Sequence, residues 1–261
     1  WAVADGLLVV RTGGPDWYLY DPVSNAWRSL PADVHGEGDW LSALGPRVYT
    51  LTHQGIAYLD VRNLTWTRLP LDPIRPALAD RTVTATSSGP VVAGYDPSQP
   101  SDLSQPRKVI ADVWDGTSWR RLPPSDQLDN SFSWTGTRMV DPLPLTRTGG
   151  KVGQPPSWGP LPMGGTLDPA TGTWGRLPKA LTGDAHGWST GGAGGPWFAV
   201  LGQVFNDVTG QVETLPKPDG APDLGMSADW ADGRLVVFGG VDTTQGYSGD
   251  ALTDRAWIFT P

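Results

Sequence analysis

Apolar residues along the chain come in short runs that alternate with polar residues, and turn-forming residues separate the runs. Alternation with a period of two is typical of β-strands, and no stretch sustains the period of a helix. One pattern recurs five times, and it predicts two paired strands, c and d, that end abruptly. The copies are YDPVSNAWRSLP (20–31), YLDVRNLTWTRLP (58–70), DVWDGTSWRRLP (112–123), LDPATGTWGRLP (167–178) and the divergent FNDVTGQVETLP (205–216).

Two further strands precede these copies. Strand b is clearest in DGLLVVRTGG (5–14) and DGRLVVFGG (232–240), and strand a in SFSWTG (131–136), GWSTGG (187–192) and MSADWADG (226–233). A repeat of roughly 40–50 residues with four antiparallel strands predicts one blade of a β-propeller. We therefore expect a single all-β domain over 1–261, a six-bladed propeller with blades at about 1–32, 33–72, 73–124, 125–180, 181–217 and 218–261.

The sixth repeat has no room for its outer strand. It contains strands a, b and c and then ends with AWIFTP (256–261). An open edge exposes unpaired backbone groups. We expect the missing strand to come from a larger polypeptide extending upstream of Trp1, or to be absent altogether.

The repeated residues suit the turns and edges of such a blade. Asp-Pro begins the turn after strand c, because Pro presets its own dihedral and Asp accepts bonds from the backbone ahead. Trp and Leu on strand d are expected to pack between blades. Pro then ends strand d because it has no N–H for a ladder, and Gly-Gly after strand b allows positive φ.

Composition excludes several classes of function. The net charge of -8 argues against non-specific nucleic-acid binding, which needs clustered Lys and Arg. The absence of Cys removes disulfides, thiolate metal sites and cysteine nucleophiles. No apolar run approaches the roughly 20 residues of a transmembrane helix, so we expect no membrane-spanning segment.

The recurring marks resemble the kelch repeat, with Gly-Gly after strand b, an aromatic-Asp run on strand c and Trp on strand d. They are most similar to bacterial kelch proteins related to the central domain of galactose oxidase, through phrases such as WTGTRMV (134–140) and LVVFGG (235–240). The resemblance implies an extracellular or cell-envelope location, with any export signal outside this chain. Galactose oxidase relatives hold copper beside a tyrosine cross-linked to cysteine; without Cys this cofactor cannot form, and we expect none.

Long insertions gather at one end of the blades. In an antiparallel blade the b-to-c and d-to-a connections share one end, and the insertions at 95–108, 142–164 and 241–254 are all b-to-c connections. Loops on a rigid scaffold commonly carry function. The candidate ligand-binding residues expected at this end are Asp39, Asp80, Arg81, Arg107, Asp129, Arg147, Trp158 and Asp184.

The carboxylates that precede the innermost strands have two interpretations. They form an acidic rim for a cationic or polyhydroxyl ligand, or they cap the d-to-a turns. Weak metal candidates are His35, Glu37 and His53, which lack typical ligand spacing. For catalysis the candidates are Arg81, Asp129 and His186.

These observations favour a binding scaffold without catalytic activity, for a protein or glycan partner at the bacterial cell envelope. The alternative is a carbohydrate-active enzyme, such as a sugar-acid epimerase, lyase or glycosidase-like protein, with its site at the channel mouth of the same face. A third possibility is a structural domain of a larger protein.

Overall fold

The protein is described by a computed structural model over residues 1–12, 16–31, 40–52, 55–74, 81–96, 107–147, 161–181, 190–200, 202–222, 226–241 and 252–261. Within these ranges every regular element is a β-strand. In the same part of the chain, no helix is long and apolar enough to cross a membrane.

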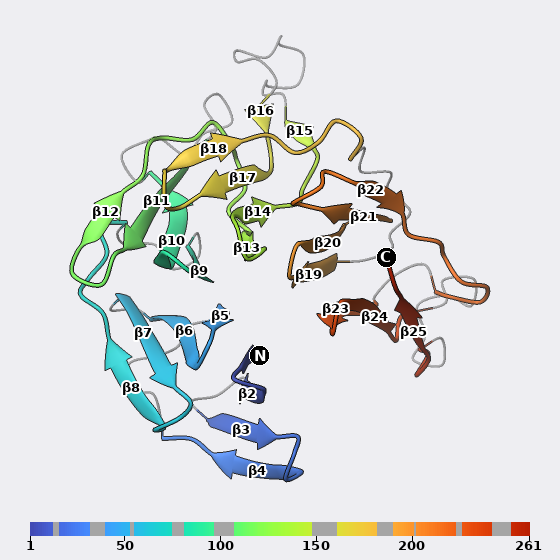
Figure 1. Ribbon diagram of the computed structural model, residues 1–261, viewed down its shortest axis with the longest axis horizontal. Coiled ribbons are helices and arrows are strands. Elements are labelled where there is room, and N and C mark those ends of the chain that lie inside the picture. Colours follow the sequence, from blue (N-terminus) through green and yellow to red (C-terminus); the bar gives the residue numbers. More distant parts are fainter. Residues whose placement is uncertain are drawn as a thin grey trace. The chain divides into compact units, whose positions relative to one another are not determined.

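The strands of residues 1–130 make three sheets, and in each the strands pair antiparallel with their neighbours in the chain. These are blades 1 to 3, which belong to one compact unit (Figure 1). Blade 1 contains β1 (Ala2–Ala4), β2 (Leu7–Arg11), β3 (Trp17–Asp21) and β4 (Ala26–Ser29). Blade 2 contains β5 (Leu41–Leu44), β6 (Arg47–Thr52), β7 (Gly55–Asp60) and β8 (Thr65–Arg68), and blade 3 contains β9 (Thr82–Thr86), β10 (Gly89–Tyr95), β11 (Val109–Trp114) and β12 (Trp119–Arg121).

The later strands make blades 4 to 6, most of whose residues belong to a second compact unit. A single parallel pair, Gly191 with Ala228, joins the sheets of blades 5 and 6. Blade 4 contains β13 (Ser133–Trp134), β14 (Met139–Asp141), β17 (Gly165–Asp168) and β18 (Thr173–Gly175), with β15 (Thr146–Arg147) and β16 (Leu161–Pro162) paired separately. Blade 5 contains β19 (Thr190–Gly194), β20 (Trp197–Val200), β21 (Gln203–Asn206) and β22 (Val212–Thr214), and blade 6 contains β23 (Ser227–Ala231), β24 (Arg234–Phe238) and β25 (Ala256–Phe259).

This strand order is that of a six-bladed β-propeller, which confirms the predicted fold class. The prediction for the last blade is also confirmed, because it has three strands and ends at β25. The predicted turn chemistry is seen after strand c of blade 1 and after strand b of blade 6. Asp21 Oδ1 accepts the backbone N–H of Val23 at 2.9 Å, and Gly239 and Gly240 have φ of 73° and 117°.

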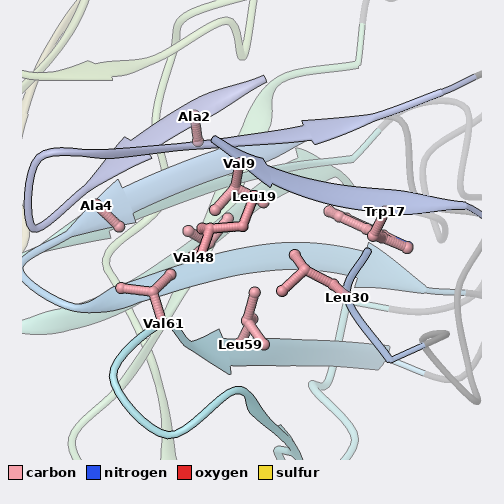
Figure 2. Close-up of a cluster of buried hydrophobic side chains, with 9 residues drawn as sticks. All are labelled: Ala2, Ala4, Val9, Trp17, Leu19, Leu30, Val48, Leu59 and Val61. Atoms are coloured by element: carbon pink, nitrogen blue, oxygen red, sulfur yellow. The ribbon is translucent and has the colours of Figure 1, made fainter. Parts of the chain in front are cut away.

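The core lies between neighbouring blades. Figure 2 shows the cluster between blades 1 and 2, in which Val9, Trp17 and Leu19 meet Val48 and Leu59. These five side chains are 0–3 % exposed. Alternation sends one side of a strand into such a cluster: in β3, Trp17 and Leu19 are buried, whereas Tyr18 and Tyr20 between and beyond them are half-buried.

Two of the strand-d tryptophans link one blade to the next by a hydrogen bond as well as by packing, whereas Trp27 in blade 1 is 58% exposed and departs from the predicted packing between blades. The indole Nε1 of Trp66 in blade 2 donates to the carbonyl of Pro31, at the end of strand d in blade 1, at 3.1 Å. Trp119 in blade 3 donates in the same way to Pro70 of blade 2 at 2.7 Å. Pro therefore supplies an acceptor to the following blade in addition to ending its own strand, a role that the sequence analysis did not identify.

Candidate functional site

Each blade has two unlike ends, and we name them by their connections. The loop end carries the b-to-c and d-to-a connections, and the turn end carries the a-to-b and c-to-d turns. The structure places all three long insertions in b-to-c connections, as predicted. They join Tyr95 to Val109 in blade 3, Asp141 to Gly165 in blade 4 and Phe238 to Ala256 in blade 6.

The insertion of blade 4 is partly built as a two-stranded ribbon, β15–β16. Thr146 pairs with Pro162 and Arg147 with Leu161. The ladder continues towards the blade, where Met163 N donates to Leu145 O at 2.8 Å. In Figure 1 the two short arrows lie beyond the outer strands of the blade. The ribbon is thus a projection with a paired backbone.

A buried carboxylate anchors the base of this ribbon. Asp141 is fully buried, and its Oδ1 accepts the N–H of Leu143 at 3.1 Å while its Oδ2 accepts that of Ser131 at 3.2 Å. Gly164 N donates to Leu143 O at 3.0 Å. A Cβ on Gly164 would collide with the carbonyl oxygens of Asp141 and Leu143. Strand b therefore leaves the blade in a defined direction, and strand c returns beside it.

Blade 3 places two of its basic residues at the loop end. Arg107 and Lys108 directly precede β11 and are half-buried. Val109 N donates to Gln127 O at 2.9 Å, and Tyr95 Oη donates to Leu128 O at 2.9 Å. The strand ends of blade 3 are thus bonded to the segment that leads to half-buried Asp129. The positions of these candidates agree with the predicted end, and their ligand roles stay predictions.

Arg81 lies in a buried ion pair with Asp72, which the sequence analysis did not single out. Their side chains are only 6 % and 2 % exposed. Burial raises the pKa of Asp72 above its usual value; the charge of Arg81 opposes this rise, and that of Asp112 adds to it. Asp112 is itself fully buried, and its carboxylate accepts Arg121 Nε at 2.7 Å. Arg81 thus has a structural role in tying the d-to-a connection to β9, independent of any ligand.

Most of the other candidates fall outside the described residues. Arg147 lies in β15, where the structure gives only its backbone. Among the described residues, no group of three or more His, Asp or Glu side chains is arranged to hold a metal. The candidates beyond the described ranges are His35, Glu37, Asp39, His53, Asp80, Trp158, Asp184 and His186.

At the turn end, ion pairs join neighbouring blades. Arg138, in the a-to-b turn of blade 4, contacts Asp207 in the c-to-d turn of blade 5, with Nη2 2.6 Å from Oδ1. Blades 1 and 2 use the same two turns with the charges exchanged, because Asp5 Oδ2 accepts Arg62 Nε at 2.6 Å. Both ion pairs join neighbouring blades of the scaffold, whereas the ribbon projects away from it.

Comparison with known proteins leaves the family open. No family model and no curated protein matches the chain. One of the solved structures that it resembles is described as "Structure of YjhT", with 10% sequence identity and a TM-score of 0.37. The match covers 59% of this chain and 48% of that chain, so it spans about half of the solved protein. The fold assignment rests on the strand order of this chain.

Proposed function

We propose that the protein is a non-catalytic binding scaffold for a protein or glycan partner, and that the partner binds at the loop end of blade 4. The β15–β16 ribbon is the observation that carries this proposal. It extends beyond the four strands of its sheet and is held by the buried carboxylate of Asp141. A projection with a paired backbone loses little conformational freedom on binding, which favours affinity.

The surface of the ribbon suits a partner that offers both apolar and polar groups. Leu145 is 50% exposed at its base and can therefore contact an apolar group of a partner. Arg147 follows two residues later in the sequence. Leucine is a residue type that contacts the apolar face of a glycan, and arginine one that contacts hydroxyl or carboxyl groups or a mixed protein surface. The location at the cell envelope rests on the kelch-like repeats and is part of the same proposal.

A ligand screen with matched variants tests this proposal. Printed glycans and a soluble glycan panel are screened by array and by thermal shift against the protein and its Leu145→Ser variant. Val23→Ser is the control, because Val23 is 95% exposed in a c-to-d turn at the turn end of blade 1. A ligand at 100 times its dissociation constant stabilises the fold by about 2.7 kcal/mol, which thermal shift detects easily.

The outcomes separate binding from catalysis. We expect binding that Leu145→Ser weakens and Val23→Ser leaves unchanged, with the ligand recovered intact. Equal binding by all three proteins would show that the ribbon is not part of the binding site. Chemical conversion of the ligand would show that the protein is an enzyme and not a non-catalytic scaffold.

If no glycan binds, we expect a protein partner, which is identified by cross-linking to envelope extract. The same variants then provide the test: Leu145→Ser must lower the yield of the cross-linked partner, and Val23→Ser must not. A yield that both variants leave unchanged would refute the proposed site.

A further inference from the structure

The insertion of blade 4 differs in charge from the rest of the chain. Its residues, 142–164, include Arg147 and Lys151 but no Asp or Glu, whereas the whole chain has a net charge of -8. Of the other two long insertions, 95–108 contain two basic and two acidic residues, and 241–254 contain three acidic residues and no Lys or Arg. A positively charged segment on an acidic protein favours an acidic partner.

The described part of the ribbon has an apolar face. Met163 N donates to Leu145 O at 2.8 Å, one step beyond the pair of Thr146 with Pro162, so Leu145 and Met163 lie opposite each other. Directly opposed residues share a face, and so do residues two apart on one strand, which adds Leu161 to this face. Leu145 is 50% exposed, and Leu161 and Met163 are half-buried. All three side chains therefore keep surface that a partner can contact.

The two edges of the ribbon differ in the backbone groups that they offer. Among the described residues the ribbon has two strands, so each strand has one edge without a pairing strand. Because Met163 bonds to Leu145 across the ribbon, the next residues along, Thr146 and Pro162, direct their backbone groups outward. Thr146 offers both an N–H and a C=O, whereas Pro162 has no N–H. The edge of β15 is therefore the one that can accept a further strand.

We propose that the ribbon binds an extended, acidic segment of a partner protein, which adds as a strand to the edge of β15 and covers the apolar face of Leu145, Leu161 and Met163. This inference rests on the function proposed above and narrows the partner to a protein. Main-chain bonds to Thr146 give affinity, and alternate side chains of the added strand meet the apolar face. Carboxylates of the partner complement the positive charge of the insertion.

The register of the added strand decides which of its amides bond to the ribbon. The partner residue directly opposite Thr146 exchanges both backbone bonds with it, and its side chain lies on the face away from Leu145. The partner residues on either side of it have side chains on the apolar face and N–H groups that point away from the ribbon. In a segment that alternates Glu with Val, Val therefore contacts the apolar face, and the N–H groups of Glu point to β15.

Peptides of alternating Glu and Val test this arrangement. The probe is fluorescein-labelled and about eight residues long, and its binding to the unaltered 1–261 chain is measured by fluorescence anisotropy. A peptide of alternating Lys and Val is the charge control and should bind at least about tenfold more weakly. N-methylation of the Glu residues removes the inward N–H groups and should also weaken binding at least about tenfold. N-methylation of the Val residues is the matched control and should change affinity less than about threefold.

Three protein variants locate the bound peptide. Leu145→Ser removes part of the apolar face, Thr146→Pro removes the outward N–H, and Arg147→Glu reverses a charge of the insertion; each should weaken binding at least about fivefold. The matched controls are Val23→Ser, Thr146→Val, which keeps the N–H, and Arg68→Glu, at an exposed position in the outer strand of blade 2. Each control should change affinity less than about twofold.

The outcomes separate this inference from the proposed function. Glycan binding that depends on Leu145, with no peptide binding at about 1 mM, would overturn the inference and leave the scaffold function intact. Equal binding of the Glu and Lys peptides, or an equal effect of the two sets of N-methyl groups, would also overturn the inference alone. Peptide binding that Leu145→Ser and Thr146→Pro both leave unchanged would contradict the inference and the proposed site together, because the peptide would then bind elsewhere.

Discussion

Replacing Arg138 by Ala should destabilise the protein far more than the same change at Arg62, although both residues join neighbouring blades at the turn end. The difference lies in the carboxylate that each leaves behind. The side chain of Asp207 is 0% exposed, whereas that of Asp5 is 31% exposed. A carboxylate that loses its cation costs little in water and much when it is buried.

The contacts of Asp207 determine how much free energy of unfolding Arg138→Ala should remove. Its Oδ1 accepts Arg138 Nε at 2.7 Å, and its Oδ2 lies 3.0 Å from Thr135 Oγ1 and 3.4 Å from Thr137 Oγ1. Breaking a buried pair typically costs about 3–5 kcal/mol. We expect about 3 kcal/mol for Arg138→Ala, because the two hydroxyls remain and the 39% exposed arginine leaves a path for water. For Arg62→Ala, an exposed pair predicts about 0.5 kcal/mol.

Urea unfolding, followed by tryptophan fluorescence, measures both changes. A double variant, Arg138→Ala with Asp207→Asn, is the control. It removes the buried negative charge that has lost its arginine, so it should recover part of the lost free energy of unfolding. Equal costs for Arg138→Ala and Arg62→Ala would refute the reasoning. So would a double variant less stable than Arg138→Ala alone.

Three further predictions follow from single contacts. The backbone N–H groups of Ser118 and Thr117 are the main cause that lowers the pKa of Asp115 to about 2, so the ionised carboxylate stabilises its turn fully above pH 3.8. Urea unfolding should therefore show that Asp115→Ala lowers the free energy of unfolding at pH 7. The difference from the unaltered protein should shrink as the pH falls towards 2. Trp119→Phe removes the bond to the preceding proline carbonyl and should cost about 1 kcal/mol, whereas Trp27→Phe, at a 58% exposed ring, should change unfolding little. Gly194→Ala would drive a Cβ into the Trp230 side chain, and calorimetry should show a loss of about 1–3 kcal/mol that a wild-type melting curve would disprove.

The architecture could be predicted because local chemistry repeats along the chain. Asp21 and Asp115 each accept backbone N–H groups from the next two or three residues, so this turn chemistry could be predicted from the sequence alone. Leu-Pro marked the ends of five outer strands, four of which also carry the Trp, and the sixth repeat contains no such segment. Each of these features depends on neighbours within a few residues.

The contacts between blades could not be predicted in the same way. The bond from Trp119 to Pro70 spans 49 residues, and that from Arg138 to Asp207 spans 69. Their partners are set by how two sheets pack, and no local pattern encodes this. Arg81 was misinterpreted for a different reason: next to an innermost strand it suggested a ligand-binding residue, because its buried partner Asp72, only nine residues away, lies in a connection without a motif.

The central claim is that the ribbon of blade 4 is the part of the scaffold that meets a partner. Site-specific photo-cross-linking tests it most directly, with a benzophenone amino acid at position 145 and, as control, at position 23 in the turn end of blade 1. The glycan or protein partner found by the screen is added, and the adducts are located by mass spectrometry. The account predicts adducts at position 145 and none at position 23, whereas adducts at position 23 alone, or equally at both, would contradict it.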